Sequence, residues 1–183
     1  MQHPSATPAE TPPEAEVLYL ARCLTPVGPY VILTSGVSVV WISPEDDAAR
    51  PVSRWQRWGA RVLEEPEPGR AAVMQLEEYF AGKRRRFSPH LDLRGTPFQC
   101  QVWGALLAIP YGETRTYLQI AQAIGRPGAV RAVGQAIGAN PLSIVVPCHR
   151  VIGSDGSLTG YGGGLERKRH LLELEARVAL PSN

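Results

Sequence analysis

The residues best suited to chemistry form one short run, Pro147-Cys148-His149-Arg150, which follows the apolar stretch 143–146. An isolated cysteine in apolar surroundings is usually an inert core residue. Here the stretch 143–146 has the pattern of a buried strand, and Pro147 ends it, so that Cys148 lies at a transition in the backbone. Positive charge beside a thiol lowers its pKa and populates the thiolate. The run therefore predicts a nucleophilic cysteine.

A cysteine nucleophile needs a base, and the base needs a partner that orients it. His149 is the nearest base in the sequence, but adjacent side chains on a regular strand project in different directions. Interaction of Cys148 with His149 therefore requires a bridging water or a turn. The acid that orients the imidazole can come from the last predicted helix, where the candidates are Glu166, Glu173 and Glu175.

Composition and spacing limit the other chemistry open to the chain. Its 183 residues are 44% hydrophobic, which suits one sizeable core or two small ones. The three cysteines, at positions 23, 100 and 148, show no CxxC spacing and are too few for a disulfide framework. We therefore expect free thiols, no metal site and no cofactor, with Cys100 as a packing residue.

The sequence indicates neither a membrane span nor export. It contains no run of about 18 apolar residues, so we expect no membrane span. The first ten residues, MQHPSATPAE, have neither an apolar segment nor an arginine-rich amphipathic pattern. Free thiols persist in a reducing compartment. We expect a cytoplasmic protein, or a nuclear one if the source is eukaryotic.

Charge is unevenly distributed along a chain whose formal net charge is only +2. Residues 1–90 carry ten Lys and Arg against eleven acidic residues, and residues 91–183 carry nine against six. Between residues 93 and 150 there are five arginines and one acid, Glu113. This local excess is compatible with a polyanionic partner. The run Lys83-Arg84-Arg85-Arg86 is expected to be a solvated connection.

The N-terminal half is predicted to be a short tail followed by an α/β domain. Four prolines within residues 1–15 predict a flexible tail. Within residues 16–90, β-branched and aromatic runs predict a three-stranded antiparallel sheet, with Ser35-Gly36 in a hairpin turn. Two segments with helical spacing follow. The expected strands are 17–22, 30–34 and 37–42, and the expected helices are 54–63 and 71–80.

Residues 91–183 are predicted to form a mainly helical domain with a helix-turn-helix. Its first helices are expected at 98–109 and, capped by Thr116, at 117–124. A third helix, 128–139, follows a short glycine-containing turn. Small residues on one face of the third helix let a backbone approach a nucleic-acid groove, or serve tight helix packing. They are Ala129, Ala132, Gly134, Ala136 and Gly138, and beside them Arg131 projects far.

The run from Pro147 to Ile152 resembles the PCHRV signature of the O6-alkylguanine-DNA alkyltransferases, also called methylated-DNA–protein-cysteine methyltransferases. The resemblance covers residues 93–175, and residues 17–90 resemble the family's variable N-terminal domain only in outline. Five further motifs and Tyr117 occur in the family's order and spacing. The motifs are Thr96-Pro97-Phe98-Gln99, Ile109-Pro110-Tyr111-Gly112-Glu113, Ala129-Val130-Arg131-Ala132-Val133-Gly134, Asn140-Pro141 and Tyr161-Gly162-Gly163-Gly164-Leu165-Glu166-Arg167-Lys168.

The resemblance implies a fold, a reaction and a partner. The N-terminal domain would be ribonuclease-H-like, and residues 91–183 would be a winged-helix-like domain that binds DNA and accepts the alkyl group. The reaction would move a methyl or other alkyl group from O6-alkylguanine, and less readily from O4-methylthymine, to Cys148. The thioether is stable, so each molecule would act once. The expected partner is double-stranded DNA containing O6-alkylguanine, bound by a monomer.

The resemblance also implies catalytic roles for four residues. His149 would deprotonate Cys148 through a water, and Glu175 would orient His149. Asn140 would hold the turn before the active-site strand and so support Cys148.

Further positions match the family's DNA-binding and pocket residues. Tyr117 would promote rotation of the target phosphate and contact the flipped base, while Arg131 would fill the vacated stack. The helix that carries Ala129 and Gly134 would enter the minor groove, with the arginines of residues 94–150 grouped around this DNA-facing segment. Val151 would line the pocket and, with Cys148, accept hydrogen bonds from the guanine amine.

The pocket loop and the zinc ligands depart from some family members. Tyr161 and the glycines after it would form the loop, where Gly162 replaces a serine but keeps the backbone N–H that can contact guanine O6. Some relatives bind zinc in the N-terminal domain. Here that region offers only His3, Cys23 and His90, so we expect no zinc.

Two other functions compete with alkyl transfer. An alkyltransferase-like protein would recognise the lesion and flag it without reacting, but such proteins replace the cysteine. A cysteine hydrolase would use Cys148 and His149, yet the sequence shows no evident oxyanion loop. A hydrolase would also leave Arg131 and Tyr117 unexplained.

Overall fold

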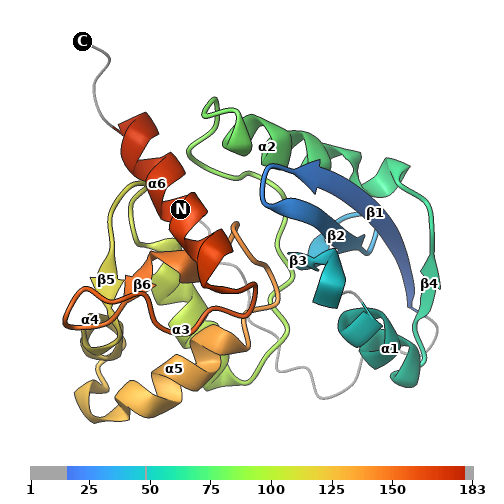
Figure 1. Ribbon diagram of the computed structural model, residues 1–183. Coiled ribbons are helices and arrows are strands. Elements are labelled where there is room, and N and C mark those ends of the chain that lie inside the picture. Colours follow the sequence, from blue (N-terminus) through green and yellow to red (C-terminus); the bar gives the residue numbers. More distant parts are fainter. Residues whose placement is uncertain (1–15, 48, 180–183) are drawn as a thin grey trace. The chain divides into compact units, whose positions relative to one another are not determined.

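The computed structural model describes residues 16–47 and 49–179, and the predicted tail of residues 1–15 lies outside them (Figure 1). The fold is mixed α/β, as predicted. The chain divides into two compact units, Met1–Thr96 and Pro97–Asn183, each of which is described by itself. The division therefore falls after Thr96, whereas the sequence suggested residue 90.

The first unit is built on a four-stranded sheet with the order β3-β2-β1-β4. The first three strands pair antiparallel, and β4 pairs parallel to β1 (Figure 1). The three antiparallel strands predicted from the sequence are confirmed, but a short fourth strand that was not predicted makes the sheet mixed. The strands are β1 Val17–Thr25, β2 Gly28–Thr34, β3 Val39–Pro44 and β4 Arg61–Leu63.

Strand β4 was missed because its residues continue the helical spacing of the segment before it. Helix α1, Ala49–Arg57, ends before Gly59, whose φ of +84° turns the chain. Glycine takes this left-handed conformation without the steric cost that a Cβ brings. Buried Trp55 of α1 packs in one apolar cluster with Leu18 and Leu33, so the helix is fixed to the sheet.

Helix α2, Arg70–Phe80, packs against β1 and covers the sheet with buried Leu76 and Tyr79 (Figure 1). The chain enters α2 through Gly69, where an added Cβ would lie 2.7 Å from the Cβ of Ala21. Only glycine permits this close approach of helix and strand.

The second unit contains four helices and a two-stranded parallel sheet among its described residues. Buried Trp103 donates from Nε1 to the carbonyl of Ala136 at 2.8 Å, which fastens α3 to α5. The three helices predicted first in this half are confirmed, with ends shifted by one or two residues. The helices are α3 Pro97–Leu107, α4 Tyr117–Ala123, α5 Val130–Gly138 and α6 Leu165–Ala179, and the strands are β5 Arg115–Thr116 and β6 Val151–Ile152.

Helix α4 begins where the sequence placed its cap. The Thr116 hydroxyl accepts a hydrogen bond from the backbone N–H of Gln119, and the Gln119 side chain accepts one from the N–H of Thr116. This reciprocal pair is a capping box and satisfies two helix N-terminal donors. The 3₁₀ turn Pro127–Ala129 then leads into α5. Tyr117 therefore occupies the first position of a helix whose N-terminus is stabilised by a capping box.

The segment before the cysteine is a turn, so the strand predicted over residues 143–146 was wrong. The N–H of Val146 donates to the carbonyl of Leu142 at 2.8 Å, which closes the turn. Ile144 is buried and has a φ of +73°. A β-branched residue in this region is strained, and packing around it must hold it there. The chain thus reaches Cys148 through a tightly folded loop.

Candidate active site

Cys148 opens a single 3₁₀ turn, Cys148–Arg150, that leads into β6. Its side chain is buried, and its Sγ accepts a hydrogen bond of 3.1 Å from Asn140 Nδ2. The same Nδ2 donates to the carbonyl of Val146 at 2.9 Å, while Asn140 Oδ1 accepts from the N–H of Leu142 at 3.0 Å. One amide side chain therefore fixes both the turn and the thiol.

The thiol of Cys148 is protonated at rest. Burial raises its pKa above the ordinary value, while the hydrogen bond from Asn140 and the charge of Lys168 act in the opposite direction with smaller effect. The sequence suggested instead that the charges of His149 and Arg150 would lower the thiol pKa. Burial outweighs charge here because the thiolate loses its hydration. A base must therefore remove the proton before the sulfur can react.

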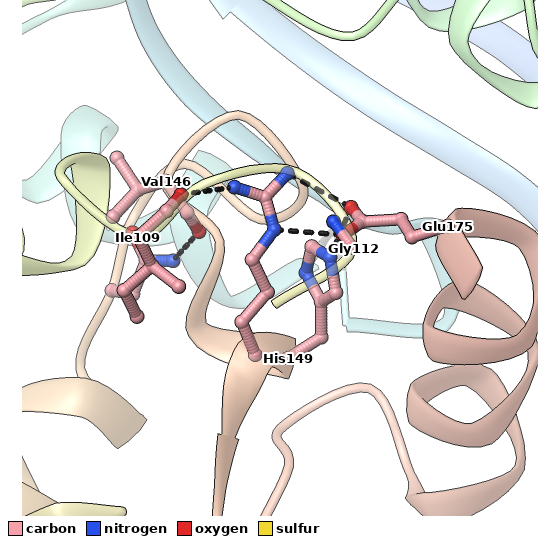
Figure 2. Close-up of polar contacts among 7 residues, drawn as sticks. Ile109, Gly112, Val146, His149 and Glu175 are labelled. Carbon is pink, nitrogen blue, oxygen red and sulfur yellow. Dashed lines mark hydrogen bonds and ion pairs between the residues drawn. The ribbon is translucent and has the colours of Figure 1, made fainter. Parts of the chain in front are cut away.

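His149 is fully buried and is oriented by Glu175 (Figure 2). Its Nε2 lies 2.9 Å from Oε1 of Glu175, and its Nδ1 has no hydrogen-bond partner within residues 16–47 and 49–179. Burial lowers the pKa of His149, and the neighbouring carboxylate only partly opposes this. We therefore assign a neutral ring whose Nε2–H donates to Glu175. That tautomer leaves a lone pair on Nδ1 as a proton acceptor.

Of the three candidate acids on α6, the structure selects Glu175. Glu166 forms an exposed ion pair with Arg169. Glu173 is exposed as well. Glu175 is the one that lies in the interior, and α6 places it there because Leu171 and Leu174 form the buried face of the same helix.

Arg150 neutralises Glu175 rather than acting on the thiol. Its Nε and Nη2 donate to the two carboxylate oxygens at 2.8 and 2.9 Å, and its Nη1 donates to the carbonyl of Ile109 at 2.6 Å. The N–H of Gly112 adds a bond of 3.0 Å (Figure 2). Burial alone would raise the pKa of Glu175, but the hydrogen bonds from His149 and Arg150 lower it to about 2. The carboxylate is therefore ionised and fixed in orientation.

Gly112 is the position where a turn and close packing both require glycine. It has a φ of +79° in the turn from Pro110 to Glu113, as the sequence predicted for these residues. A Cβ added there would lie 2.7 Å from the Cβ of Ala179. This turn brings the Gly112 N–H against Glu175.

Lys168 is a site residue that sequence reasoning missed. It is fully buried on α6, and its Nζ donates to the carbonyls of Val151 and Thr159, each at 2.6 Å. Burial lowers the pKa of Lys168, and attraction to Cys148 opposes this change. Its spacing with Leu171 and Leu174 was an available signal, because a cation in phase with a buried apolar face must have interior partners.

The loop from residue 153 to 164 contacts Tyr117 through Thr159. The Tyr117 hydroxyl donates to the carbonyl of Thr159 at 3.2 Å, the same carbonyl that Lys168 contacts. The Tyr161 carbonyl accepts from the N–H of Gly164 at 2.9 Å. An added Cβ at Gly162 would meet nothing within 4 Å, so the loop has space for the serine that the family resemblance implies at this position in other members.

Helix α5 presents Arg131 to solvent. Its side chain is exposed and has no polar partner among the described residues. Of the two purposes that the sequence left open for the small residues beside it, the contacts support helix packing. A Cβ at Gly134 would lie 3.8 Å from the ring of Tyr117, which indicates packing. Ala132 and Gly138 are exposed, and Ala129 is half-buried.

The predicted grouping of arginines around this helix is only partly correct. Arg94 pairs with Glu16 and Asp92 in the first unit, Arg115 pairs with Glu113, and Arg150 pairs with Glu175. Arg126 and Arg131 are exposed on the helix-turn-helix. Which arginines form ion pairs depends on tertiary contacts, and a count of charges along the sequence does not show those contacts.

Residues 16–47 and 49–179 hold no group of three or more His, Cys, Asp or Glu side chains arranged to bind a metal ion. Cys23 is buried in β1, where burial raises the pKa of its thiol to about 11. His90 is exposed, and His3 lies outside the described residues. Within the same ranges no helix is both long and apolar enough to cross a membrane.

Known proteins resemble this chain over most of its length. Residues 97–177 match the family model described as 6-O-methylguanine DNA methyltransferase, DNA binding domain. A methylated-DNA–protein-cysteine methyltransferase of Mycobacterium tuberculosis is 52% identical over 153 residues, which is 82% of this chain and 88% of the relative. An inducible enzyme of the same name from Bacillus subtilis is 42% identical, covering 82% and 86%.

Solved structures agree with the sequence comparison. The crystal structure of Mycobacterium tuberculosis O6-methylguanine methyltransferase has a TM-score of 0.79 and 48% identity, covering 91% of this chain and 96% of that one. Mycobacterium tuberculosis OGT in complex with DNA has a TM-score of 0.78 and 48% identity, covering 87% and 94%. With this identity and coverage, the chain belongs to the family of the methylated-DNA–protein-cysteine methyltransferases.

Proposed function

We propose that this protein repairs DNA by transferring an alkyl group from O6 of guanine to Sγ of its own Cys148. The observation that carries the proposal is the buried series of Cys148, His149 and Glu175, in which the free side of the imidazole can accept a proton. Relatives named for transfer from methylated DNA to a protein cysteine support it.

The proposed step is a displacement at the alkyl carbon. The thiol proton passes through a water to Nδ1 of His149, and ionised Glu175 stabilises the imidazolium. The thiolate attacks the alkyl carbon, so that an S–C bond forms and the C–O6 bond breaks with its electron pair going to O6. The proton from the thiol finally reaches the guanine, which leaves neutral. The thioether is stable, and each molecule therefore acts once.

Two further side chains stabilise the thiolate as it forms. The Asn140 amide already donates to Sγ at 3.1 Å, and Lys168 supplies a positive charge within the same buried region. Both interactions strengthen when the sulfur becomes negative, because hydrogen bonds to ions are stronger than those between neutral groups. They therefore favour the reacting state over the resting thiol.

A base within duplex DNA must leave the stack before its O6 can meet the thiol. We infer that Arg131 fills the vacated space from the exposed side of α5, and that Tyr117 rotates the target phosphate and contacts the flipped base. The small residues Ala129 and Gly134 let α5 approach the minor groove. The pocket would be completed by the Val151 carbonyl, the N–H of Gly162, and Tyr161.

The finer features of the family extend this proposal. We infer that O4-methylthymine is a weaker substrate and that a monomer acts on double-stranded DNA in the cytoplasm, or in the nucleus of a eukaryotic source. We also infer that the first unit is ribonuclease-H-like, and that the second is a winged-helix-like domain that both binds DNA and accepts the alkyl group.

The test is conversion of a defined lesion. An oligonucleotide duplex with one O6-methylguanine is incubated with the protein, digested to nucleosides and analysed for guanine by chromatography. Wild type should restore guanine, while Cys148→Ala should bind the duplex without restoring it. Cys100→Ala is the matched control and should act like wild type. Tight binding by wild type without conversion would contradict the proposal and support a lesion-recognition protein.

The contribution of Arg131 can be separated from the chemistry. Arg131→Ala should slow transfer from duplex DNA more than transfer from free O6-methylguanine, because only the duplex requires base flipping. Equal slowing on both substrates would argue against insertion of Arg131 into the stack.

A further inference from the structure

The first unit has four of its cations in one uninterrupted run. Residues 1–82 contain six arginines and eleven acidic residues, and the next four residues, Lys83-Arg84-Arg85-Arg86, are all cations. We call residues 83–86 the basic segment. The run concentrates positive potential at one point of a unit that is otherwise acidic. Charges that only keep a protein soluble are spread over its surface, whereas a cluster of one sign is typical of a contact with a polyanion.

The basic segment has a fixed backbone. The N–H groups of Lys83 and Arg84 both donate to the carbonyl of Glu78, and Arg84 Nε donates to the Glu78 carboxylate at 2.6 Å. The chain beyond is fastened too, since the N–H of Ser88 donates to Gln75 Oε1 at 2.9 Å and the Phe87 ring lies 5.5 Å from that of Tyr79.

The fastening uses the side chain of Arg84. Arg84 pairs with Glu78, whereas the side chains of Lys83, Arg85 and Arg86 are exposed. Those of Lys83 and Arg86 have no polar partner within residues 16–47 and 49–179. A cation just after the end of α2 stabilises the helix dipole, but that effect falls off within a turn and does not need three exposed charges.

We propose that the basic segment binds phosphates of the duplex DNA on which the protein acts, as a contact of the first unit in addition to that of the helix-turn-helix. The inference rests on the proposed function, because the function supplies the polyanion. Lys83 and Arg86 lie three residues apart, so their Cα atoms are at most about 10 Å apart. That reach covers about three phosphates of one strand at 3.4 Å of helix axis each.

The test compares two variants with the same loss of charge. Lys83→Gln/Arg85→Gln/Arg86→Gln removes the exposed cations of the basic segment. The control, Arg57→Gln/Arg61→Gln/Arg70→Gln, removes three exposed arginines elsewhere in the first unit. The dissociation constant for an unmodified duplex is measured over a salt series. Lys83 and Arg86, whose side chains have no polar partner among the described residues, would each contact one phosphate. Loss of these two contacts should flatten the slope of log K against log salt by about 2 and weaken binding about 60-fold at 0.1 M salt.

Transfer from free O6-methylguanine to Cys148 is measured for all three proteins. The basic-segment variant should keep the wild-type rate on free base, which also shows that it is folded. An unchanged salt slope and affinity, or an equal loss in the control, would overturn the inference. A lowered thermal midpoint with unchanged DNA affinity would also overturn it, by assigning the cations to the end of α2. Failure of wild type to accept an alkyl group would instead refute the proposed function.

Discussion

Replacing Glu175 by glutamine tests whether its charge holds the active site together. The substitution keeps the size of the side chain and removes the negative charge that two donors of Arg150 and the Nε2–H of His149 contact. An amide also places an NH₂ group where an acceptor is required. The buried guanidinium of Arg150 then lacks its counter-ion, which is among the costly defects in a protein interior.

The magnitude follows from the pKa of Glu175, which is about 2 in the fold against an ordinary 4.5. This difference corresponds to about 3 kcal/mol of stability at pH 7. Because the pKa in the fold is depressed, the contribution is complete above the ordinary pKa and is lost as the pH falls towards 2. Between pH 7 and pH 3 the wild type should therefore lose about 2 kcal/mol from this group alone.

The assay is urea unfolding of the full chain at several pH values between 7 and 3. Glu175→Gln should lower the free energy of unfolding by about 3 kcal/mol at pH 7, and its difference from wild type should shrink by about 2 kcal/mol at pH 3. Glu173→Gln, two residues earlier on α6 and exposed, is the control and should change stability by less than about 0.5 kcal/mol. A gap between wild type and Glu175→Gln that stays constant with pH would refute the assigned charge state.

Three other substitutions test the remaining parts of the site. Lys168→Met should raise the pKa of the Cys148 thiol further, so that transfer slows about tenfold at pH 7 and recovers as the pH rises; a pH–rate profile without an upward shift would contradict this. Asn140→Ala should slow transfer at least about tenfold and cost about 1–3 kcal/mol in urea unfolding, because Sγ and the carbonyl of Val146 lose their donor. Gly112→Ala should cost about 2 kcal/mol or more in thermal unfolding, whereas Gly128→Ala, where a Cβ has open space, should cost less than about 0.5 kcal/mol; equal costs would refute the packing argument.

The candidate nucleophile and base, Cys148 and His149, could be proposed from the sequence because their signal is local. The run through Cys148 and His149 is contiguous, whereas the residues alone left Glu166, Glu173 and Glu175 open as the acid, and Glu175 was implied by the family resemblance. That an interaction between adjacent Cys148 and His149 requires a turn or a water stays a prediction, and both residues lie in one 3₁₀ turn.

The charge environment could not be predicted, because it depends on burial and on partners distant in the sequence. Arg150 stands beside the nucleophile in the chain, yet its charge is taken up by Glu175, 25 residues away. The cation that does act on Cys148 is Lys168, which approaches from α6. Likewise, no periodicity could show that Ile144 adopts a left-handed turn, since packing imposes it against the residue's own preference.

The first unit likewise contains elements with a local sequence signal and one element that depends on a distant partner. Long strands with β-branched residues were found, but the three residues of β4 are too few for a pattern and gain their structure by pairing with β1. Short elements of this kind depend on their neighbours, so local sequence carries little information about them.

The central claim is that Cys148 is the alkyl acceptor, and peptide mapping tests it most directly. The protein is incubated with excess duplex containing O6-methylguanine, digested and analysed by mass spectrometry, with the peptides of Cys23 and Cys100 as internal controls. We predict one methyl group per molecule, on Cys148 alone, with no further uptake on longer incubation. An unmodified Cys148 in protein that binds the lesion, or methyl groups on the other two cysteines, would contradict the account.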